Sequence, residues 1–400
     1  MPKALLLENI HPLAADALKR AGFEVETQKG ALDENALIEA LDGVDLLGIR
    51  SKTNVTQRVV EARPELTAVG CFCIGTNQVD LKAASNKGIG VFNAPYSNTR
   101  SVVELVVSDI ISLMRRLPDH MRHMRDGVWD KTATGSHEVR GKTLGIIGYG
   151  NIGSQLSVLA EALGMSVIFY DIDEKLAMGN ARRANSLEEL LEESDAVTIH
   201  VDGRKENTNF FGEEQLARMK TGAILINLSR GFVVDLDALK SHLNSGHLSG
   251  AAVDVYPVEP KKSGDEFLSS LREEHNVILT PHIGGSTLEA QESIGQFVSH
   301  KLIDYWRSGT TALSVNLPPI NLDSPAGGVR RVAHLHINMP GVLAQVNHTL
   351  GDEDINITAQ ALGTVDNLGY VVTDVSPDPS ADIIAKLSDL PGTIRVRLLG

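Results

Sequence analysis

Six residues, Gly148-Tyr149-Gly150-Asn151-Ile152-Gly153, constrain the fold of this chain more than any other feature. They follow the apolar run 143–147, which predicts a strand, and they open a stretch with helical periodicity up to about residue 163. Glycines between a strand and a helix permit a tight turn, close approach of the backbone to a pyrophosphate, and close packing of helix on strand. We therefore predict a doubly wound parallel sheet with a phosphate-binding helix N-terminus.

An acidic residue at the end of the next predicted strand specifies the ligand further. Asp171 stands 21 residues after Gly150, where a carboxylate can accept hydrogen bonds from the ribose hydroxyls of adenosine. The same carboxylate repels a 2′-phosphate, and the next two residues offer no arginine. We predict NAD as the cofactor, against the alternative that the glycines only shape a turn.

Strands and helices alternate over two blocks of the chain, which predicts two parallel sheets covered by helices. In the first block strands are predicted at 4–7, 23–26, 46–49, 68–72 and 89–92, with helices at 13–21 and 34–41. In the second block strands are predicted at 144–147, 166–170, 196–201, 223–227, 250–253 and 277–279, with helices at about 152–163, 187–193 and 236–244. Long helices are expected at 101–117, stopped by Pro118, and at about 288–306.

The last 70 or so residues follow a different pattern. Prolines and the pair Gly327–Gly328 predict a linker. Beyond it we expect strand 332–338, helix 341–350, strands 355–363 and 368–375, helix 380–387 and strand 393–398. That order is the ferredoxin-like α+β unit. The predicted domains are a substrate-binding domain (1–97 and 285–326), an NAD-binding domain (98–284) and a regulatory domain (327–400).

Composition excludes several classes of protein. With 42% hydrophobic and 22% charged residues the chain is globular rather than disordered, and no apolar run reaches the length of a membrane span. A formal net charge of −14 disfavours nucleic acid as a partner. Cys71 and Cys73 are too close in sequence for an unstrained bridge, which favours a reducing cytoplasm. No metal site is predicted.

Three segments after strands of the second block together carry an arginine, a carboxylate and a histidine. These are Arg230, Glu259 and His282, and parallel sheets bind ligands at that edge. A histidine can accept the hydroxyl proton of a 2-hydroxy acid, a carboxylate can fix its tautomer and raise its pKa, and an arginine can hold the substrate carboxylate. Each residue alone has an ordinary structural explanation. Together, beside an NAD fingerprint, they predict hydride transfer.

At this point the chain resembles the D-isomer-specific 2-hydroxyacid dehydrogenases over its whole length. More closely, it is similar to their shorter bacterial branch, which acts on 3-phospho-D-glycerate and ends in an ACT domain. The motifs that carry this resemblance are Arg50-Ser51-Lys52-Thr53, Ile74-Gly75-Thr76-Asn77-Gln78-Val79-Asp80, Asn93-Ala94-Pro95-Tyr96-Ser97-Asn98-Thr99-Arg100-Ser101-Val102, the glycine fingerprint, Ser229-Arg230-Gly231, the Glu259 segment and the run from Pro281 to Thr287.

The resemblance implies a role for each matching residue. Arg230 would bind the substrate carboxylate, Glu259 would support the histidine, and His282 would exchange the proton. The implied cofactor contacts are Gly148, Gly150, Asn151, Ile152, Gly153, Asp171, Leu228, Ser229, Arg230, Asp254, His282, Ile283, Gly284 and Gly285. The implied substrate contacts are Arg50, Ser51, Gly75, Asn98 and Lys131, with a solvated surface as the alternative for Arg50 and Lys131.

One segment departs from the family pattern. After the strand predicted at 196–201 the family usually has a proline, whereas this chain has Asp202-Gly203-Arg204. The departure leaves the wall of the adenine pocket open to question, but not the chemistry.

The tail resembles an ACT domain, in which the related enzyme binds serine between two copies. Carried over, His336 and Asn338 would come from one chain and Asn356 from its partner. The resemblance thus implies L-serine as an effector, a homodimer or homotetramer, and a hinge at Gly327–Gly328. An exposed edge strand of such a unit favours pairing with a second copy. The alternative is a tail that serves assembly only.

The resemblance implies oxidation of 3-phospho-D-glycerate to 3-phosphohydroxypyruvate, the first committed step of L-serine synthesis. A side activity that reduces 2-oxoglutarate is a further expectation. Two alternatives stay open: a dehydrogenase of the glyoxylate or hydroxypyruvate type, and an NAD(H)-sensing binding protein that reuses the fold.

Overall fold

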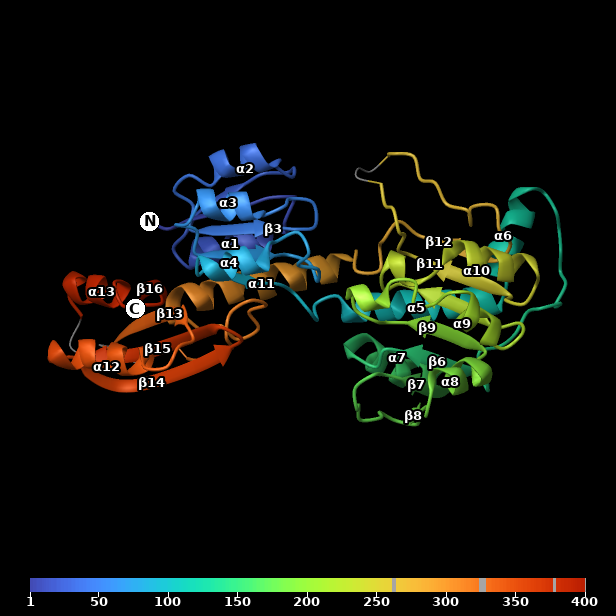
Figure 1. Ribbon diagram of the computed structural model, residues 1–400. Coiled ribbons are helices and arrows are strands. Elements are labelled where there is room, and N and C mark those ends of the chain that lie inside the picture. Colours follow the sequence, from blue (N-terminus) through green and yellow to red (C-terminus); the bar gives the residue numbers. More distant parts are fainter. Residues whose placement is uncertain (261–263, 324–328, 377–378, 400) are drawn as a thin grey trace. The chain divides into compact units, whose positions relative to one another are not determined.

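Three sheets carry the fold in the part of the chain that the structure describes, residues 1–260, 264–323, 329–376 and 379–399. The structure is a computed structural model, and it divides the chain into two compact units. One unit is Met1–Ser97 with Gln291–Gly400, and the other is Asn98–Ala290 (Figure 1). Each unit is described by itself below.

The first unit contains a parallel sheet of five strands in the order β2-β1-β3-β4-β5. This is the flavodoxin-like order, with connections through helices as parallel strands require. The strands are β1 (Lys3–Leu6), β2 (Glu24–Thr27), β3 (Leu46–Ile49), β4 (Ala68–Cys71) and β5 (Gly90–Phe92). The helices are α1 (Pro12–Arg20), α2 (Glu34–Ala40), α3 (Gln57–Ala62), α4 (Leu81–Asn86) and, from the later segment, α11 (Leu288–Ser308), which begins in the second unit.

The second unit contains a parallel sheet in the order β12-β11-β10-β9-β6-β7-β8, with the Rossmann reversal beside β6. Its strands are β6 (Thr143–Ile147), β7 (Ser166–Tyr170), β8 (Arg182–Arg183), β9 (Ala196–Ile199), β10 (Ile224–Asn227), β11 (Gly250–Val253) and β12 (Val277–Leu279). Its α-helices are α5 (Thr99–Met114), α6 (Leu117–Arg125), α7 (Asn151–Ala162), α8 (Leu187–Glu193), α9 (Glu213–Arg218) and α10 (Leu236–Asn244), and short 3₁₀ turns lie at Lys205–Asn207 and Gly231–Val233.

The third sheet belongs to the first unit and is antiparallel, in the order β14-β15-β13-β16. Its elements are β13 (Arg330–Ile337), α12 (Val342–Asp352), β14 (Asn356–Val365), β15 (Leu368–Ser376), α13 (Ala381–Ser388) and β16 (Thr393–Leu399). The predicted β-α-β-β-α-β order is therefore confirmed. With the two parallel sheets, it confirms the predicted fold class.

This antiparallel sheet packs on both faces. Val332 and Val375 lie in an apolar cluster with residues of α12 and α13. Leu335 and Tyr370 instead belong to the same core as residues of β1, α1 and α11. The tail is thus part of the continuous core of the first unit. The predicted hinge, Gly327–Gly328, lies outside the described residues.

Local structure differs from prediction at Pro118. The long helix was expected to run to residue 117, but α5 ends at Met114 and Arg116 adopts a left-handed φ of 52°. A second helix, α6, then starts with Pro118 in its first turn, a position where the missing N–H costs nothing. Proline therefore begins a helix here rather than ending one. Within the described ranges, no helix has the length and apolar character needed to cross a bilayer.

Candidate active site

The glycine turn joins β6 to α7 in the way its sequence predicts. Gly148 has φ +91°, and a Cβ there would stand 2.6 Å from the carbonyl oxygen of His200 at the end of β9. A Cβ on Gly153 would collide with the carbonyl of Gly148. Gly150 has open space around its Cβ position and caps α7. The first amides of α7 are therefore accessible, and the missing side chain at Gly150 leaves room for a pyrophosphate to approach them closely.

Asp171 lies beside this turn, just beyond β7. Its Oδ2 accepts a hydrogen bond from the amide of Tyr149 at 2.7 Å, and its Oδ1 accepts one from the amide of Asp173 at 2.9 Å. These two donors orient a partly exposed carboxylate next to the glycine turn. The position suits a group that binds ribose hydroxyls.

Asp254 organises the turn that carries the histidine. It is 1% exposed and follows β11. Its oxygens accept hydrogen bonds from Thr280 Oγ1 at 2.6 Å and from the amides of Ile283 and Gly284 at 2.8 Å each. His282 sits inside this turn with a left-handed φ of 56°, a conformation that the three bonds stabilise.

His282 and Glu259 form a close pair in this turn. The imidazole Nδ1 lies 3.0 and 2.9 Å from the two Glu259 carboxylate oxygens, and the amide of Tyr256 donates to Oε1 at 3.2 Å. The hydrogen bond to Glu259 raises the pKa of His282 against the effect of burial. Burial acts to raise the pKa of Glu259, but the bond and charge of His282 prevail and lower it. With Nδ1 bound, Nε2 of the half-exposed ring is left to exchange a proton.

The loop after β10 presents Arg230. Asn227 accepts from the amide and hydroxyl of Ser229 at 3.1 and 2.7 Å, and donates to the Arg230 carbonyl at 3.1 Å. The guanidinium donates to the Ser229 carbonyl at 2.7 Å. Its charge acts on both Glu259 and His282. The structure therefore brings together the predicted arginine, carboxylate and histidine at one edge of the sheet.

Asn98 and Lys131 have very different surroundings in this unit. Asn98 precedes α5, its amide nitrogen lies against Gly285, and its Oδ1 is buried with no hydrogen-bond partner. An unpaired buried acceptor at this turn suits a ligand with a donor group. Lys131 is exposed in the loop after α6, and the structure brings it to none of the other predicted site residues of the unit.

The first unit groups the remaining predicted substrate contacts. Gln78 donates to the carbonyl of Arg50 at 2.6 Å and to that of Gly75 at 3.2 Å, which holds two loops side by side. Glu8 accepts from the amides of Arg50, Lys52 and Thr53 at 3.2, 3.0 and 2.8 Å. Ser51 is exposed on this loop.

Two family models match separate parts of this chain. Residues 107–284 match the model of the D-isomer specific 2-hydroxyacid dehydrogenase NAD-binding domain, and residues 332–395 match that of an AHAS small subunit-like ACT domain. The D-3-phosphoglycerate dehydrogenase of Haemophilus influenzae is 52% identical, over 99% of this chain and 97% of that protein. This chain belongs to the D-isomer-specific 2-hydroxyacid dehydrogenase family. The predicted resemblance is thereby confirmed.

Two further relatives support this assignment. The D-3-phosphoglycerate dehydrogenase of Escherichia coli K12 is 50% identical over 99% of this chain and 97% of its own length. The D-lactate dehydrogenase of Aquifex aeolicus, solved with NAD and lactic acid, aligns with a TM-score of 0.66 and 27% identity, over 76% of this chain and 95% of that one. The prediction of an NAD-dependent dehydrogenase is confirmed, and so is NAD as the cofactor.

The dehydrogenase's ACT domain holds the three residues predicted for an effector. His336 on β13 is 3% exposed, with Nδ1 bound to the Ile337 carbonyl at 2.9 Å and Nε2 buried without a partner. Asn338, just after β13, and Asn356, at the start of β14, are exposed. Asn356 thus begins an edge strand of the sheet, whereas His336 lies on a central strand.

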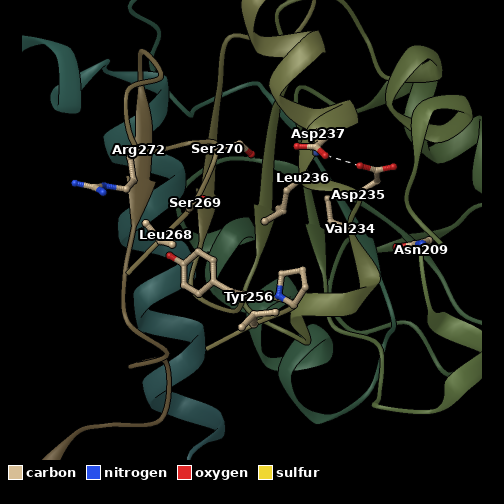
Figure 2. A pocket seen from close by; sticks show the side chains of 12 residues that line it. Asn209, Val234, Asp235, Leu236, Asp237, Tyr256, Leu268, Ser269, Ser270 and Arg272 are labelled. Carbon is tan, nitrogen blue, oxygen red and sulfur yellow. Dashed lines mark hydrogen bonds between the residues drawn. The ribbon is translucent and has the colours of Figure 1, made fainter. Parts of the chain in front are cut away.

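A cavity of about 640 Å³ lies elsewhere in the second unit, next to Tyr256 (Figure 2). Asp235 and Asp237 line it, and the Asp235 carboxylate accepts from the amides of Asp237 and Ala238 as the N-cap of α10. None of the predicted catalytic or cofactor residues lines this cavity. It therefore lies outside the candidate site.

Sequence reasoning missed the residues that hold the site loops. Glu8 and Gln78 are 8% and 5% exposed, unusual burial for a carboxylate and an amide. Gln78 stood inside a quoted motif, but no local pattern indicated which loops either residue joins. The partners of Glu8, and Arg50 as a partner of Gln78, lie 28 or more residues away in sequence, so local patterns do not indicate these contacts.

Proposed function

We propose that this dehydrogenase oxidises 3-phospho-D-glycerate to 3-phosphohydroxypyruvate, the first committed step of L-serine synthesis. The observation that carries the proposal is the His282–Glu259 pair beside Arg230, in a chain 52% identical to a D-3-phosphoglycerate dehydrogenase over nearly its full length. The reducing environment that its two cysteines favour supports a cytoplasmic enzyme.

Three side chains of the second unit would carry the proton and hold the reacting group. NAD, when bound, supplies the acceptor for the hydride from C2. His282 takes the hydroxyl proton at Nε2, because Glu259 holds Nδ1 and so fixes the tautomer. Arg230 holds the substrate carboxylate and polarises the adjacent oxygen. In the reverse direction His282 returns the proton.

The predicted cofactor contacts fall into three groups in this proposal. Asn151 and Ile152 at the start of α7 bind the pyrophosphate through their amides, and Asp171 binds the ribose. Asp254 and the turns around it border the nicotinamide end, and the contacts there are Leu228, Ser229, Arg230, His282, Ile283, Gly284 and Gly285.

The substrate phosphate needs cationic and polar partners because it is a dianion. We assign these to Arg50, Ser51 and Gly75 of the first unit and to Asn98 and Lys131 of the second. The unpaired buried Oδ1 of Asn98 is an acceptor, so it suits a hydroxyl of the substrate rather than its phosphate. The domain division proposed is a substrate-binding domain of 1–97 and 285–326, an NAD-binding domain of 98–284 and a regulatory domain of 327–400.

The ACT domain is proposed to bind L-serine between two copies of the chain and to inhibit the enzyme. An imidazole and two amides offer both donors and acceptors to a zwitterionic amino acid. Two observations support the site: the unpartnered Nε2 of His336, and Asn356 at the start of an edge strand that a second copy could meet. The enzyme would then be a homodimer or homotetramer.

The test is NADH formation from 3-phospho-D-glycerate, measured with and without millimolar L-serine. Turnover that serine suppresses supports both parts of the proposal, whereas turnover without suppression contradicts the regulatory part alone. Absence of turnover, with NADH still bound, contradicts the substrate. Glyoxylate, hydroxypyruvate and 2-oxoglutarate, assayed with NADH, then decide among the alternatives and reveal the expected side activity on 2-oxoglutarate.

A further inference from the structure

The segment that departs from the family pattern, Asp202-Gly203-Arg204, follows β9 in the structure. Strand β9 lies between β10, which leads into the Arg230 loop, and β6, which leads into the glycine turn. Loops after neighbouring parallel strands share one edge of the sheet. The departure therefore stands beside the candidate site, in place of an uncharged proline.

Asp202 and Arg204 pair with each other within this loop. Arg204 Nε lies 2.8 and 3.0 Å from the two carboxylate oxygens of Asp202, and Nη2 lies 2.6 Å from Oδ2. The Arg204 amide and the Asn207 side chain also donate to Oδ1, at 3.2 and 3.1 Å. Both oxygens of the carboxylate are thus bound by donors of its own loop.

Arg230 lies against the middle of the same loop. A Cβ on Gly203 would stand 3.3 Å from Arg230 Nε, 3.8 Å from Cδ and 3.9 Å from Cγ. The pKa of Asp202 is lowered by its bonds to Arg204 first, against a smaller effect of burial, and the charge of Arg230 contributes to the same lowering. Asp202 is therefore, after Glu259, a second carboxylate on which the positive charge of Arg230 acts. If it were unpaired, it would compete there with an anionic substrate.

We propose that Arg204 is a positioning residue: by holding the Asp202 carboxylate within its own loop, it keeps the Arg230 guanidinium available to the substrate. The inference rests on the proposed role of Arg230 as the group that binds the substrate carboxylate. A proline at position 202 would offer no carboxylate, so a family member with proline there needs no such partner.

The test is a cycle of three variants, Arg204→Ala, Asp202→Asn and the double variant, with kcat, KM for 3-phospho-D-glycerate and Kd for NADH measured for each. We expect Arg204→Ala to raise KM about two- to fivefold, the size typical of a partly exposed ion pair, with kcat within about twofold. Asp202→Asn alone should change little, and the double variant should return KM close to that of the parent. Arg218→Ala, which breaks the exposed Arg218–Glu214 pair, is the matched control and should change nothing.

Rescue by Asp202→Asn separates this role from a structural one, because loss of a merely structural pair would affect the single variants alike. An unchanged KM in Arg204→Ala overturns the proposal, and so does a raised KM that Asp202→Asn fails to relieve. Arg230→Ala identifies the other source of failure. If Arg230→Ala leaves KM unchanged, the proposed function of Arg230 is wrong, whereas a large rise in KM there with no effect of Arg204→Ala overturns only the positioning role.

Discussion

At the scale of single residues, the contact between His282 and Glu259 sets the protonation of the site. The carboxylate lies within 3.0 Å of Nδ1 and raises the pKa of the imidazole. The turn held by Asp254 keeps the backbone of His282 in a left-handed conformation. A base of raised pKa is a stronger proton acceptor, but a larger fraction of it is already protonated at neutral pH. The pair thus makes His282 a stronger base but leaves less of it in the neutral form that can accept a proton.

Removing the charge of Glu259 should move the pH dependence of the enzyme. In the proposed mechanism oxidation requires neutral His282, so kcat/KM should rise with pH through the pKa of the histidine. Glu259→Gln lowers that pKa, and the acidic limb of the profile should shift to lower pH while maximal turnover falls because the ring is less well oriented. The measurement is kcat/KM from about pH 5 to 9. A limb that stays in place would show that another group titrates there.

His282→Ala should remove proton exchange itself. Turnover is expected to fall by about 10²- to 10⁴-fold, the usual contribution of general acid–base catalysis, while Kd for NADH changes little. Steady-state kinetics and NADH fluorescence titration measure the two quantities. A variant that keeps its turnover would favour the NAD(H)-sensing alternative over the enzyme.

Asp109 on α5 should make stability depend on pH. It is 4% exposed, and burial first, then the charge of Asp254, raises its pKa to about 7. The folded state therefore holds this proton more tightly than the unfolded chain. The resulting stabilisation is complete below about pH 4 and is lost as the pH rises to about 7, an effect on the order of 3–4 kcal/mol.

Asp109→Asn removes this titration and should gain stability relative to the parent as the pH rises from 5 to 8. Thermal unfolding at each pH measures the difference in Tm. Glu104→Gln changes a carboxylate that is 60% exposed on the same helix, and it serves as the exposed control. A constant difference between Asp109→Asn and the parent would refute the buried titration.

At the scale of elements, the glycine turn shows how a local sequence pattern and a distant strand act together. The φ of Gly148 follows from the turn itself, but its contact is with the carbonyl of His200 beyond β9. The helix α6 shows the opposite case, because α5 ends at Met114 and Pro118, predicted to stop that helix, instead lies in the first turn of the next one. Proline marks a helix boundary without telling which side of it is helical.

Gly153→Val should disrupt the packing of α7 against β6. The side chain would collide with the carbonyl of Gly148 and displace the helix N-terminus that is proposed to bind the pyrophosphate. We expect NADH affinity to fall at least about tenfold, measured by fluorescence titration. Gly127→Ala, at a position with open space but φ +76°, controls for a general loss of stability. Equal effects in both variants would argue against a specific role of the turn.

At the scale of the whole molecule, the ACT sheet is held to the first parallel sheet by more than apolar contact. Tyr370 donates its hydroxyl to the Gly309 carbonyl at 2.7 Å. Arg395 donates to the carbonyls of Leu66 and Glu65 at 2.7 and 3.0 Å. An effector bound to the ACT domain, as proposed, would therefore act on the first parallel sheet through these contacts as well as through the chain connection.

A chain that ends after Asp323 should be strongly destabilised rather than merely unregulated. It would expose the core shared by β1, α1 and α11, including Tyr305, which is 2% exposed in the full chain. We expect a lower Tm and binding of a hydrophobic dye at temperatures where the full chain binds none. A truncated enzyme with unchanged Tm would show that the tail is an independent domain.

The sequence by itself determined most of the strands and the longer helices, the glycine turn, the order of the ACT unit and the three residues proposed for chemistry, because each depends on patterns within a few neighbouring positions. It missed the short helices α3, α4, α6 and α9 and the strand β8. Only the tertiary structure decided which loops meet. Glu8 forms a hydrogen bond with the loop of Arg50, and Asp254 forms one with the turn of His282. Gly203 packs against the side chain of Arg230. These contacts join residues that are 27 or more positions apart, and burial of a few polar side chains between packed strand ends selects them. No local pattern encodes that selection.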